Sequence, residues 1–333
     1  MTFRSKPLSL VALLAAAIVL LVGCSSSDSP SSGTANEASS SSDGTWPRTV
    51  THEAGETTIP AKPKNIVSTS VSVTGTLLAI GAPVTASAAT KPGPTTDGKG
   101  FFTQWASVAD ERGVTVLYPN LALDIESVIA AKPDLIVVST SGADSVLPQY
   151  KELSAIAPTV VVNYGDKTWQ DLATQLGAAT GQEESAKKVT DEFNAYVADA
   201  ATKIKAPTGT TSIVAFNGAK DSAVAKTTGT HAKLYTALGF TVVQAPDGLD
   251  TSEQKRDDVA WVTLENLSKA VAGDTVMLMS GTDETVKQFK STPVLANLAA
   301  VKSGAVHPMG NSFRLDYYSA KQLVDLVKTQ FAS

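Results

Sequence analysis

A charged guanidinium and two phenols lie close together in sequence near the C-terminus of this 333-residue chain. They belong to the segment Phe313-Arg314-Leu315-Asp316-Tyr317-Tyr318-Ser319-Ala320, which precedes a predicted amphipathic helix. Arginine presents N–H donors in a planar fork and stacks on aromatic rings, so Arg314 beside tyrosines suits a planar, aromatic anion. The alternative is that Arg314 pairs with Asp316 while both tyrosines pack in the core. The segment by itself leaves both interpretations open.

The other residues that could carry chemistry do not indicate a metal site or a hydrolase. The three histidines, His52, His231 and His307, are scattered, whereas a protein-held zinc or manganese ion needs several ligands at matched loop positions. No Gly-x-Ser-x-Gly elbow, His-Glu-x-x-His pair or Gly-x-Gly-x-x-Gly loop after a strand occurs. We therefore expect no catalytic residue, no cofactor and no metal held directly by the protein.

Residues 1–23 are typical of a secretory signal peptide. Two basic residues precede an apolar run, Leu8 to Val22, that is too short for a comfortable membrane span. The run ends in Leu21-Val22-Gly23-Cys24, which resembles the bacterial motif at which the signal is cut and the cysteine is lipidated. Cys24 is the only cysteine, which excludes an internal disulfide. We expect a lipid on Cys24 to anchor the protein to the cell membrane, outside the cytoplasm.

The chain after the signal is polar at its start and acidic overall. Residues 24–45 are Ser-rich without a large apolar side chain, which predicts a flexible tether. The chain has 27 basic and 32 acidic residues, so loss of the two basic residues of the signal changes the formal net charge from −5 to −7. We expect no nucleic-acid partner, and an anionic ligand has to meet a local basic cluster.

Short β-branched runs alternate with helical segments along the rest of the chain, which predicts βα units. The runs fall into two groups, one within residues 46–181 and one within residues 206–333. Between them lies the bridging segment 182–205, in which the 22 residues Glu183 to Ile204 carry the longest helical pattern, with apolar side chains at three- and four-residue steps. This pattern predicts an N-terminal and a C-terminal α/β lobe joined by one helix about 33 Å long.

Several segments resemble the ferric enterobactin-binding proteins, which are substrate-binding components of siderophore ABC transporters. The octapeptide Phe313–Ala320 and the segment Gly100-Phe101-x-x-Gln104-Trp105 are similar to that branch in particular. Lys132-Pro133-Asp134-Leu135-Ile136 is shared by the wider iron-siderophore, haem and cobalamin-binding group. The resemblance covers nearly all of residues 46–333. It implies two Rossmann-like lobes bridged by a single long α-helix, with the ligand in the cleft between them and only a small closing movement.

The resemblance also implies a function. A protein of this kind captures a ferric siderophore, here an enterobactin-like catecholate, outside the cytoplasm and delivers it to an ABC permease of the cell membrane. The iron stays inside its own chelator, so the protein supplies cations and aromatic faces instead of metal ligands. The protein is expected to act as a monomer and not as an enzyme.

Candidate ligand-binding residues follow from the same resemblance. Arg314 is the main candidate for charge recognition, and Tyr317 is its expected stacking or hydrogen-bonding neighbour. In the loop from Lys91 to Trp105, Lys99 could reach an anion and Phe101, Phe102 or Trp105 could line the wall of the cleft.

The chain departs from the family at two of these positions. Pro94 stands near the place where the family has an arginine. Lys226 stands in the loop Ala215–Thr230, where the family has an aromatic residue that stacks on the ligand. Both departures bear on which siderophore is bound.

Two glutamates have a different expected role. Glu126 and Glu265 each begin a predicted helix after a loop, where the helix dipole favours a carboxylate. In the related binding proteins, one glutamate on each lobe docks onto arginines of the permease. The match in position predicts the same role for Glu126 and Glu265.

Other ligands and one other class of function stay open. Intact catecholates, hydrolysed fragments, mixed catecholate–hydroxamate chelators and other siderophores all fit the resemblance. Haem is a further alternative, because related haem-binding proteins use Tyr or His as ligands and Tyr317 is available. The rival of a different class is an extracytoplasmic siderophore esterase.

Overall fold

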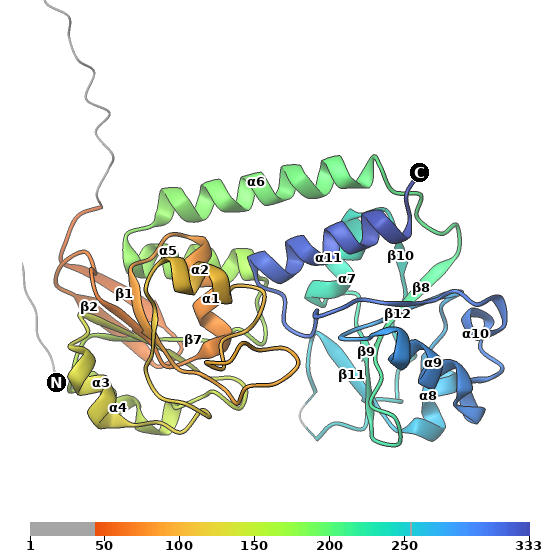
Figure 1. The fold of residues 1–333 in the computed structure, drawn as a ribbon, viewed down its shortest axis with the longest axis horizontal. Helices are drawn as coiled ribbons and strands as arrows, with labels where there is room; N and C mark the ends of the chain where they lie inside the picture. The colour runs from red at the N-terminus through yellow and green to blue at the C-terminus, as the bar shows by residue number, and fades with distance from the viewer. Residues whose placement is uncertain (1–43, 254) are drawn as a thin grey trace, which may run out of the picture. The chain divides into compact units, whose positions relative to one another are not determined.

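A computed structural model of the chain describes residues 44–253 and 255–333 (Figure 1). The predicted signal peptide, Cys24 and nearly all of the predicted tether lie outside the described residues. Across the two described stretches, every helix is too short or too polar to cross a membrane. Below, the N-terminal half means residues 44–182 and the C-terminal half means residues 202–333 without residue 254.

The N-terminal half is built on a parallel sheet of five strands. Strand β6 reads Leu-Ile-Val-Val-Ser and is buried along its whole length, because helices cover both faces of the sheet. In sheet order the strands are β5 (Thr115–Val116), β4 (Val84–Ser87), β3 (Ile66–Ser68), β6 (Leu135–Ser139) and β7 (Thr159–Val162). The remaining elements are the hairpin β1 (Arg48–His52) and β2 (Gly55–Ile59), and the helices α1 (Val71–Ala79), α2 (Ala106–Glu111), α3 (Ile125–Ala131), α4 (Tyr150–Ser154) and α5 (Trp169–Thr180).

The C-terminal half contains a mixed sheet of six strands. Its order is β11 (Val259–Val262), β9 (Ser222–Ala225), β8 (Thr210–Ala215), β12 (Thr275–Leu278) and β13 (Val306–Pro308), and β10 (Thr241–Val242) also pairs with β8. The helices are α7 (Thr230–Ala237), α8 (Leu264–Ala270), α9 (Asp283–Ser291), α10 (Ala299–Ser303) and α11 (Tyr317–Gln330). The α/β prediction is therefore confirmed.

One part of the C-terminal half differs from the expectation. The predicted loop Ala215–Thr230 contains strand β9, which pairs antiparallel with both β8 and β11. Its sequence, Ser-Ala-Val-Ala, has little intrinsic preference for a strand, so the pairing partners decide its conformation. Lys226 follows β9 directly, and its backbone N–H donates to the Asp258 carbonyl at 2.9 Å.

The longest helix, α6 (Glu183–Ala201), connects the two halves in sequence. It forms where the apolar stripe predicts a helix, and the side chains of the stripe are buried: Ala186, Val189, Phe193, Val197 and Ala200. Helix α11 packs against both α6 and α1, and it lies beside α6 in Figure 1. The Tyr196 hydroxyl of α6 donates to Asp325 of α11. Helix α11 of the C-terminal half thus also contacts the N-terminal half. That α6 acts as a rigid hinge, and that the lobes divide at residues 181 and 206, stay predictions.

The two halves share one apolar core. A single cluster of buried side chains extends from Leu77 and Leu135 of the N-terminal half, through Phe193 of α6, to Ile213 and Leu323 of the C-terminal half. Burial of this continuous surface stabilises the contact between the halves, at roughly 25 cal/mol for each Å² of apolar area removed from water. The halves are therefore held together by packing as well as by the chain.

A close contact between the halves lies at Gly75 of α1. A Cβ atom at this position would lie 2.5 Å from the Asp316 Oδ2 atom and 2.8 Å from the Trp105 Cδ1 atom. Asp316 caps the N-terminus of α11, so Gly75 allows α1 and the start of α11 to approach each other.

Replacement of Gly75 by alanine is expected to lower the free energy of unfolding by about 1–3 kcal/mol, because the added methyl group overfills this contact. Urea unfolding followed by tryptophan fluorescence measures the change. Gly98→Ala is the matched control, since a Cβ there meets no atom within 4 Å. Equal stability of the two variants would show that the contact at Gly75 is not tight in solution.

Candidate ligand-binding site

Side chains from both halves meet in a cleft around Arg314. The N-terminal half contributes Phe102, Gln104 and Tyr164, and the C-terminal half contributes Asp258 in addition to Arg314 itself. The enclosed floor of this cleft has a volume of about 50 Å³. A water molecule takes up about 30 Å³ in the liquid, so the floor holds little more than water and a larger ligand has to lie above it.

The Arg314 guanidinium has no hydrogen bond and no ion pair with any described residue. Its central carbon lies 5.0 Å from the centre of the Tyr164 ring and 5.2 Å from the centre of the Phe313 ring. Cation–π attraction to the two rings stabilises the charge while its N–H donors stay unused. A half-buried arginine with unused donors is suited to bind an oxyanion from the cleft.

The alternative pairing of Arg314 with Asp316 does not form. The Asp316 carboxylate is buried, caps α11 by accepting from the Ser319 N–H at 2.9 Å, and accepts from the Gln104 Nε2 atom at 3.3 Å. Burial raises the pKa of Asp316, although the hydrogen bonds from Ser319 and Gln104 oppose this shift. The cap and the Gln104 contact therefore occupy the one carboxylate that the sequence places beside Arg314.

The segment that carries Arg314 is fixed on both sides. The Ser319 hydroxyl donates to the Arg314 carbonyl at 2.9 Å. The His231 Nε2–H donates to the Ser312 carbonyl at 2.5 Å, and burial lowers the pKa of His231, so the ring is neutral near pH 7. On the other half, the Gln104 Oε1 atom accepts from the Asn311 Nδ2 atom at 3.1 Å. Arg314 thus extends from a segment held by both halves.

A second arginine lies close to this site. Arg256 makes a forked pair with the Asp258 carboxylate, at 2.7 Å from Nε and 2.6 Å from Nη2. Burial opposes ionisation of Asp258, but the hydrogen bonds and the charge of Arg256 hold the pKa of Asp258 below its ordinary value. The carboxylate is therefore ionised, and Arg256 offsets its charge beside Arg314.

Tyr317 does not lie beside Arg314. Its ring packs against Trp169 at 5.5 Å, Phe193 at 6.2 Å and Tyr318 at 5.2 Å between ring centres, next to α6. The prediction that Tyr317 is the aromatic neighbour of Arg314 is wrong, because Tyr317 is the first residue of α11 and the helix turns it toward α5 and α6. Tyr164, which follows β7, takes that place.

The loop Lys91–Trp105 also differs from the prediction. Phe101 and Trp105 have no exposed surface and pack in the core at 5.2 Å between ring centres, so they do not line the cleft. Lys99 forms an ion pair with Asp110 of α2 and is not at the cleft. A bridge between Thr96 and Phe102 folds the loop back, which leaves Phe102 at the wall.

Lys226 is not a free cation either. Its ammonium group donates to the Arg256 carbonyl and to the Asp250 carboxylate, the latter at 3.4 Å. These bonds hold the segment that carries Arg256 and Asp258. Lys226 does not line the cleft in this structure.

The two glutamates expected at the permease are both exposed. Glu126 lies in the first turn of α3 and Glu265 in the first turn of α8. Neither carboxylate has a hydrogen bond or ion pair within residues 44–253 and 255–333. In Figure 1, α3 and α8 lie at the end of each half that is farther from α6.

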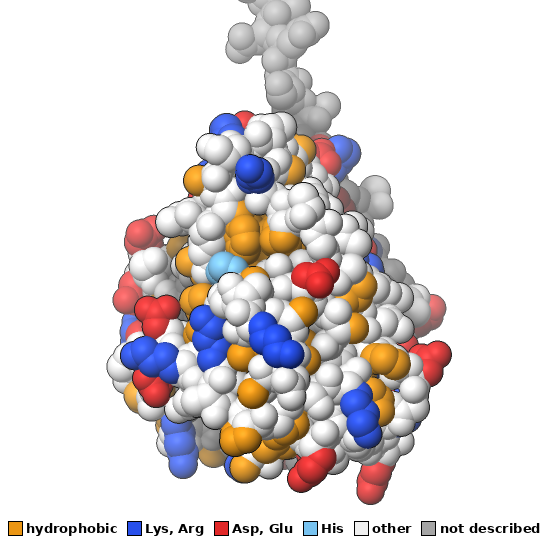
Figure 2. Space-filling model, turned by 90° about the vertical axis from the view of Figure 1, so that its right-hand side faces the viewer, with side chains coloured by type: hydrophobic (Ala, Val, Ile, Leu, Met, Phe, Trp, Pro, Cys, Tyr) orange, Lys and Arg blue, Asp and Glu red, His pale blue; other side chains and the backbone are white. Residues whose placement is uncertain are grey.

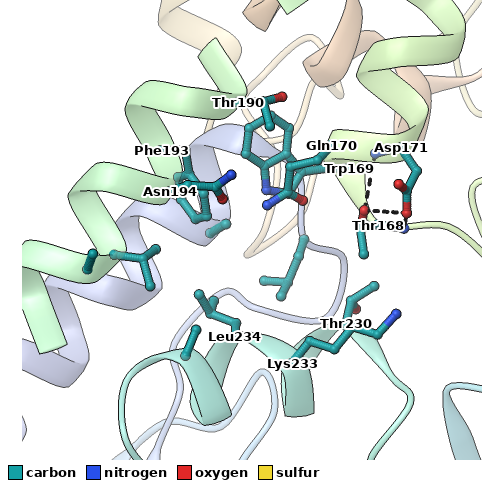
Figure 3. Close-up of a pocket in the computed structure, with 15 residues that line it drawn as sticks. Thr168, Trp169, Gln170, Asp171, Thr190, Phe193, Asn194, Thr230, Lys233 and Leu234 are labelled. Carbon is teal, nitrogen blue, oxygen red and sulfur yellow. Dashed lines mark hydrogen bonds between the residues drawn. The ribbon is translucent and has the colours of Figure 1, made fainter. Parts of the chain in front are cut away.

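A larger cavity lies on the α6 side of the contact between the halves. It has a volume of about 490 Å³ and is lined by the start of α5, one face of α6 and α7, with Trp169, Phe193 and Leu234 among its residues (Figure 3). Its volume exceeds that of the cleft floor, but the unpaired arginine lies in the cleft. The unpaired Arg314 therefore makes the cleft, and not the larger cavity, the candidate site.

The face of the C-terminal half shown in Figure 2 has a mixed charge pattern. Lys and Arg side chains are interspersed with acidic and uncharged ones, and the hydrophobic side chains form small groups. This face offers no continuous basic surface of the kind that binds nucleic acid.

Comparison with known proteins gives relatives that match most of the chain. The ferric enterobactin-binding periplasmic protein FepB of Escherichia coli O6:H1 is 41% identical over 291 residues, which cover 86% of this chain and 91% of FepB. The probable siderophore-binding lipoprotein YfiY of Bacillus subtilis is 28% identical over 98% of each chain. The crystal structure of holo-ViuP superposes with a TM-score of 0.81 at 40% identity, covering 87% of this chain and 97% of ViuP.

The sequence profile of the family described as periplasmic binding protein matches residues 66–312. This range includes both sheets and most of the residues that line the cleft. The chain belongs to the periplasmic binding protein family.

Proposed function

We propose that this protein is the extracytoplasmic substrate-binding component of an ABC importer and that the cleft at Arg314 binds a ferric catecholate siderophore. The observation that carries the proposal is the unpaired Arg314 guanidinium close to the rings of Tyr164 and Phe313. The 41% identity to FepB, whose name gives ferric enterobactin as its ligand, supports the same ligand class.

The chemistry of the cleft suits such a ligand. A ferric tris-catecholate is a trianion with flat aromatic rings and an iron that its chelator already saturates. It is recognised from outside by cations and aromatic faces. Arg314 supplies the cation, Arg256 offsets the charge of Asp258, and Phe102 and Phe313 supply aromatic surface at the wall. Phe313 is 50% exposed, so its ring is available to a ligand above the cleft floor.

Asp258 limits the range of suitable ligands. Its ionised carboxylate lies in the cleft, so a ligand has to keep its anionic oxygens on the Arg314 side. Repulsion between like charges then orients a trianion within the cleft. Lys226 acts indirectly in this proposal, through its bonds to Asp250 and the Arg256 carbonyl.

The proposed transport cycle has four steps. The protein captures the ligand in the cleft, closes slightly, docks on the permease through Glu126 and Glu265, and releases the ligand. The lipid on Cys24 keeps the protein at the membrane throughout, and the lipoprotein name of YfiY supports this anchor. The protein binds its ligand without turnover and acts as a monomer.

Arg314→Ala is expected to weaken ferric enterobactin binding at least tenfold, or about 1.4 kcal/mol, because the variant lacks the unpaired cation. Quenching of tryptophan fluorescence in the fragment 46–333 measures the affinity, with a ferric hydroxamate and haemin as comparison ligands. Lys99→Ala is the control, since its ammonium group is already paired with Asp110.

Three results would contradict parts of the proposal. An unchanged affinity of a folded Arg314→Ala protein would remove Arg314 from the site. Tighter binding of haemin or of the hydroxamate would keep the transport role but replace the ligand. Recovery of hydrolysed siderophore after binding would favour the esterase alternative.

Substitution of Glu126 and Glu265 by alanine is expected to reduce siderophore uptake by cells at least fivefold while leaving ligand affinity unchanged. The reason is that both carboxylates are unpaired, exposed and remote from the cleft. Glu284→Ala on α9 is the control, because Glu284 is exposed and pairs only with Lys287 of its own helix. Uptake equal to that of the unmodified protein would exclude docking through these two residues.

A further inference from the structure

A buried carboxylate lies behind the aromatic ring that contacts Arg314. Asp144 is 4% exposed and accepts three hydrogen bonds: from the Ser70 hydroxyl at 2.6 Å, the Ser72 N–H at 2.9 Å and the Tyr164 hydroxyl at 2.8 Å. It thereby connects the N-terminus of α1 to the segment that follows β7. Both carboxylate oxygens are in use.

The phenol of Tyr164 is fixed in place by its surroundings. A Cβ atom at Gly142 would overlap the Tyr164 hydroxyl, so the hydroxyl lies directly against the backbone at this position. Gly142 also has a φ of +79°, which favours glycine there. Burial, followed by the charge of Asp144, raises the pKa of Tyr164 to about 12, so the phenol stays protonated and donates.

This arrangement determines which part of Tyr164 a ligand meets. The hydroxyl is used within the protein, and the ring face is directed at the Arg314 guanidinium, 5.0 Å from its central carbon. A ring that could rotate away would leave Arg314 with Phe313 alone as an aromatic neighbour.

We propose that Asp144 is a positioning residue of the Arg314 site, which holds the Tyr164 phenol so that its ring lies against the guanidinium. The effect on the ligand rests on the proposed function, whereas the effect on the ring is a property of the unliganded protein.

One oxygen of Asp144 serves the two donors of Ser70 and Ser72, and the other serves the Tyr164 hydroxyl alone. An asparagine could still hold the ring, because its Nδ2 group can donate to the Tyr164 hydroxyl oxygen. Alanine has no polar atom at this position. In the Asp144→Ala variant the Tyr164 hydroxyl therefore loses its bond to Asp144, and we expect the ring to lose its fixed orientation.

The first test needs no ligand. In nuclear magnetic resonance spectra, the Tyr164 ring is expected to shift the Arg314 side-chain protons upfield, and Asp144→Ala is expected to remove at least half of that shift. The phenol titration of Tyr164, followed with ring-labelled tyrosine, is expected to move to lower pH, because the charge of Asp144 contributes to its raised pKa. An unchanged Arg314 shift in Asp144→Ala would overturn the proposal.

The control for this test is Asp134→Ala in the same half. Asp134 also uses both carboxylate oxygens as acceptors, from the backbone N–H groups of Lys64 and Asn65. This substitution removes a comparable set of hydrogen bonds without touching Tyr164, so the Arg314 shift is expected to stay unchanged.

The second test uses ferric enterobactin. Asp144→Ala is expected to weaken binding about fivefold in the unmodified protein but less than twofold in the Tyr164→Phe background, where the hydrogen bond is already absent. Equal losses in the two backgrounds would show that Asp144 does not act through Tyr164. Failure of the unmodified protein to bind ferric enterobactin would contradict the proposed ligand, while the Arg314 shift would still decide the role of Asp144.

Discussion

The buried carboxylate of Asp316 is the constraint on which the candidate site depends. It lies two residues from Arg314, yet its oxygens cap α11 and accept from Gln104 across the contact between the halves. A buried acceptor without partners would cost about 1–3 kcal/mol of stability. The bonds from Ser319 and Gln104 avoid this cost, so both stabilise the buried carboxylate. Because Asp316 is used in this way, Arg314 keeps its charge and its donors available.

The same contact explains why two sequence motifs far apart in the chain occur together. Gln104 belongs to the segment Gly100–Trp105, and Asp316 belongs to the segment Phe313–Ala320. In the folded protein the two segments meet, and Gln104 also accepts from Asn311 at 3.1 Å. The two motifs therefore form part of the contact between the halves, and Arg314 lines the cleft beside it.

The sequence predicted the alternating α/β pattern, the long helix and the position of Arg314, since each depends on local patterning or on one residue type. It did not predict the aromatic neighbour of Arg314. Tyr164 is separated from Arg314 by 150 residues, and only the folded loops bring it there. Phe101 and Trp105 were misplaced because residue type cannot tell which aromatic side chains of a loop turn inward. Lys226 was misplaced because its partner Asp250 belongs to another segment.

The contacts of Arg314 also bear on how ligand capture and closure are connected. Its chain segment is bonded to Gln104 of the N-terminal half and to His231 of the C-terminal half, while its guanidinium lies against Tyr164 of the N-terminal half. A movement of one half relative to the other has to change at least one of these contacts. The shared apolar core opposes large movements, because separating the halves would expose buried side chains to water. The structure thus favours small displacements at the cleft. Such displacements change the contacts of Arg314, which carries the charge.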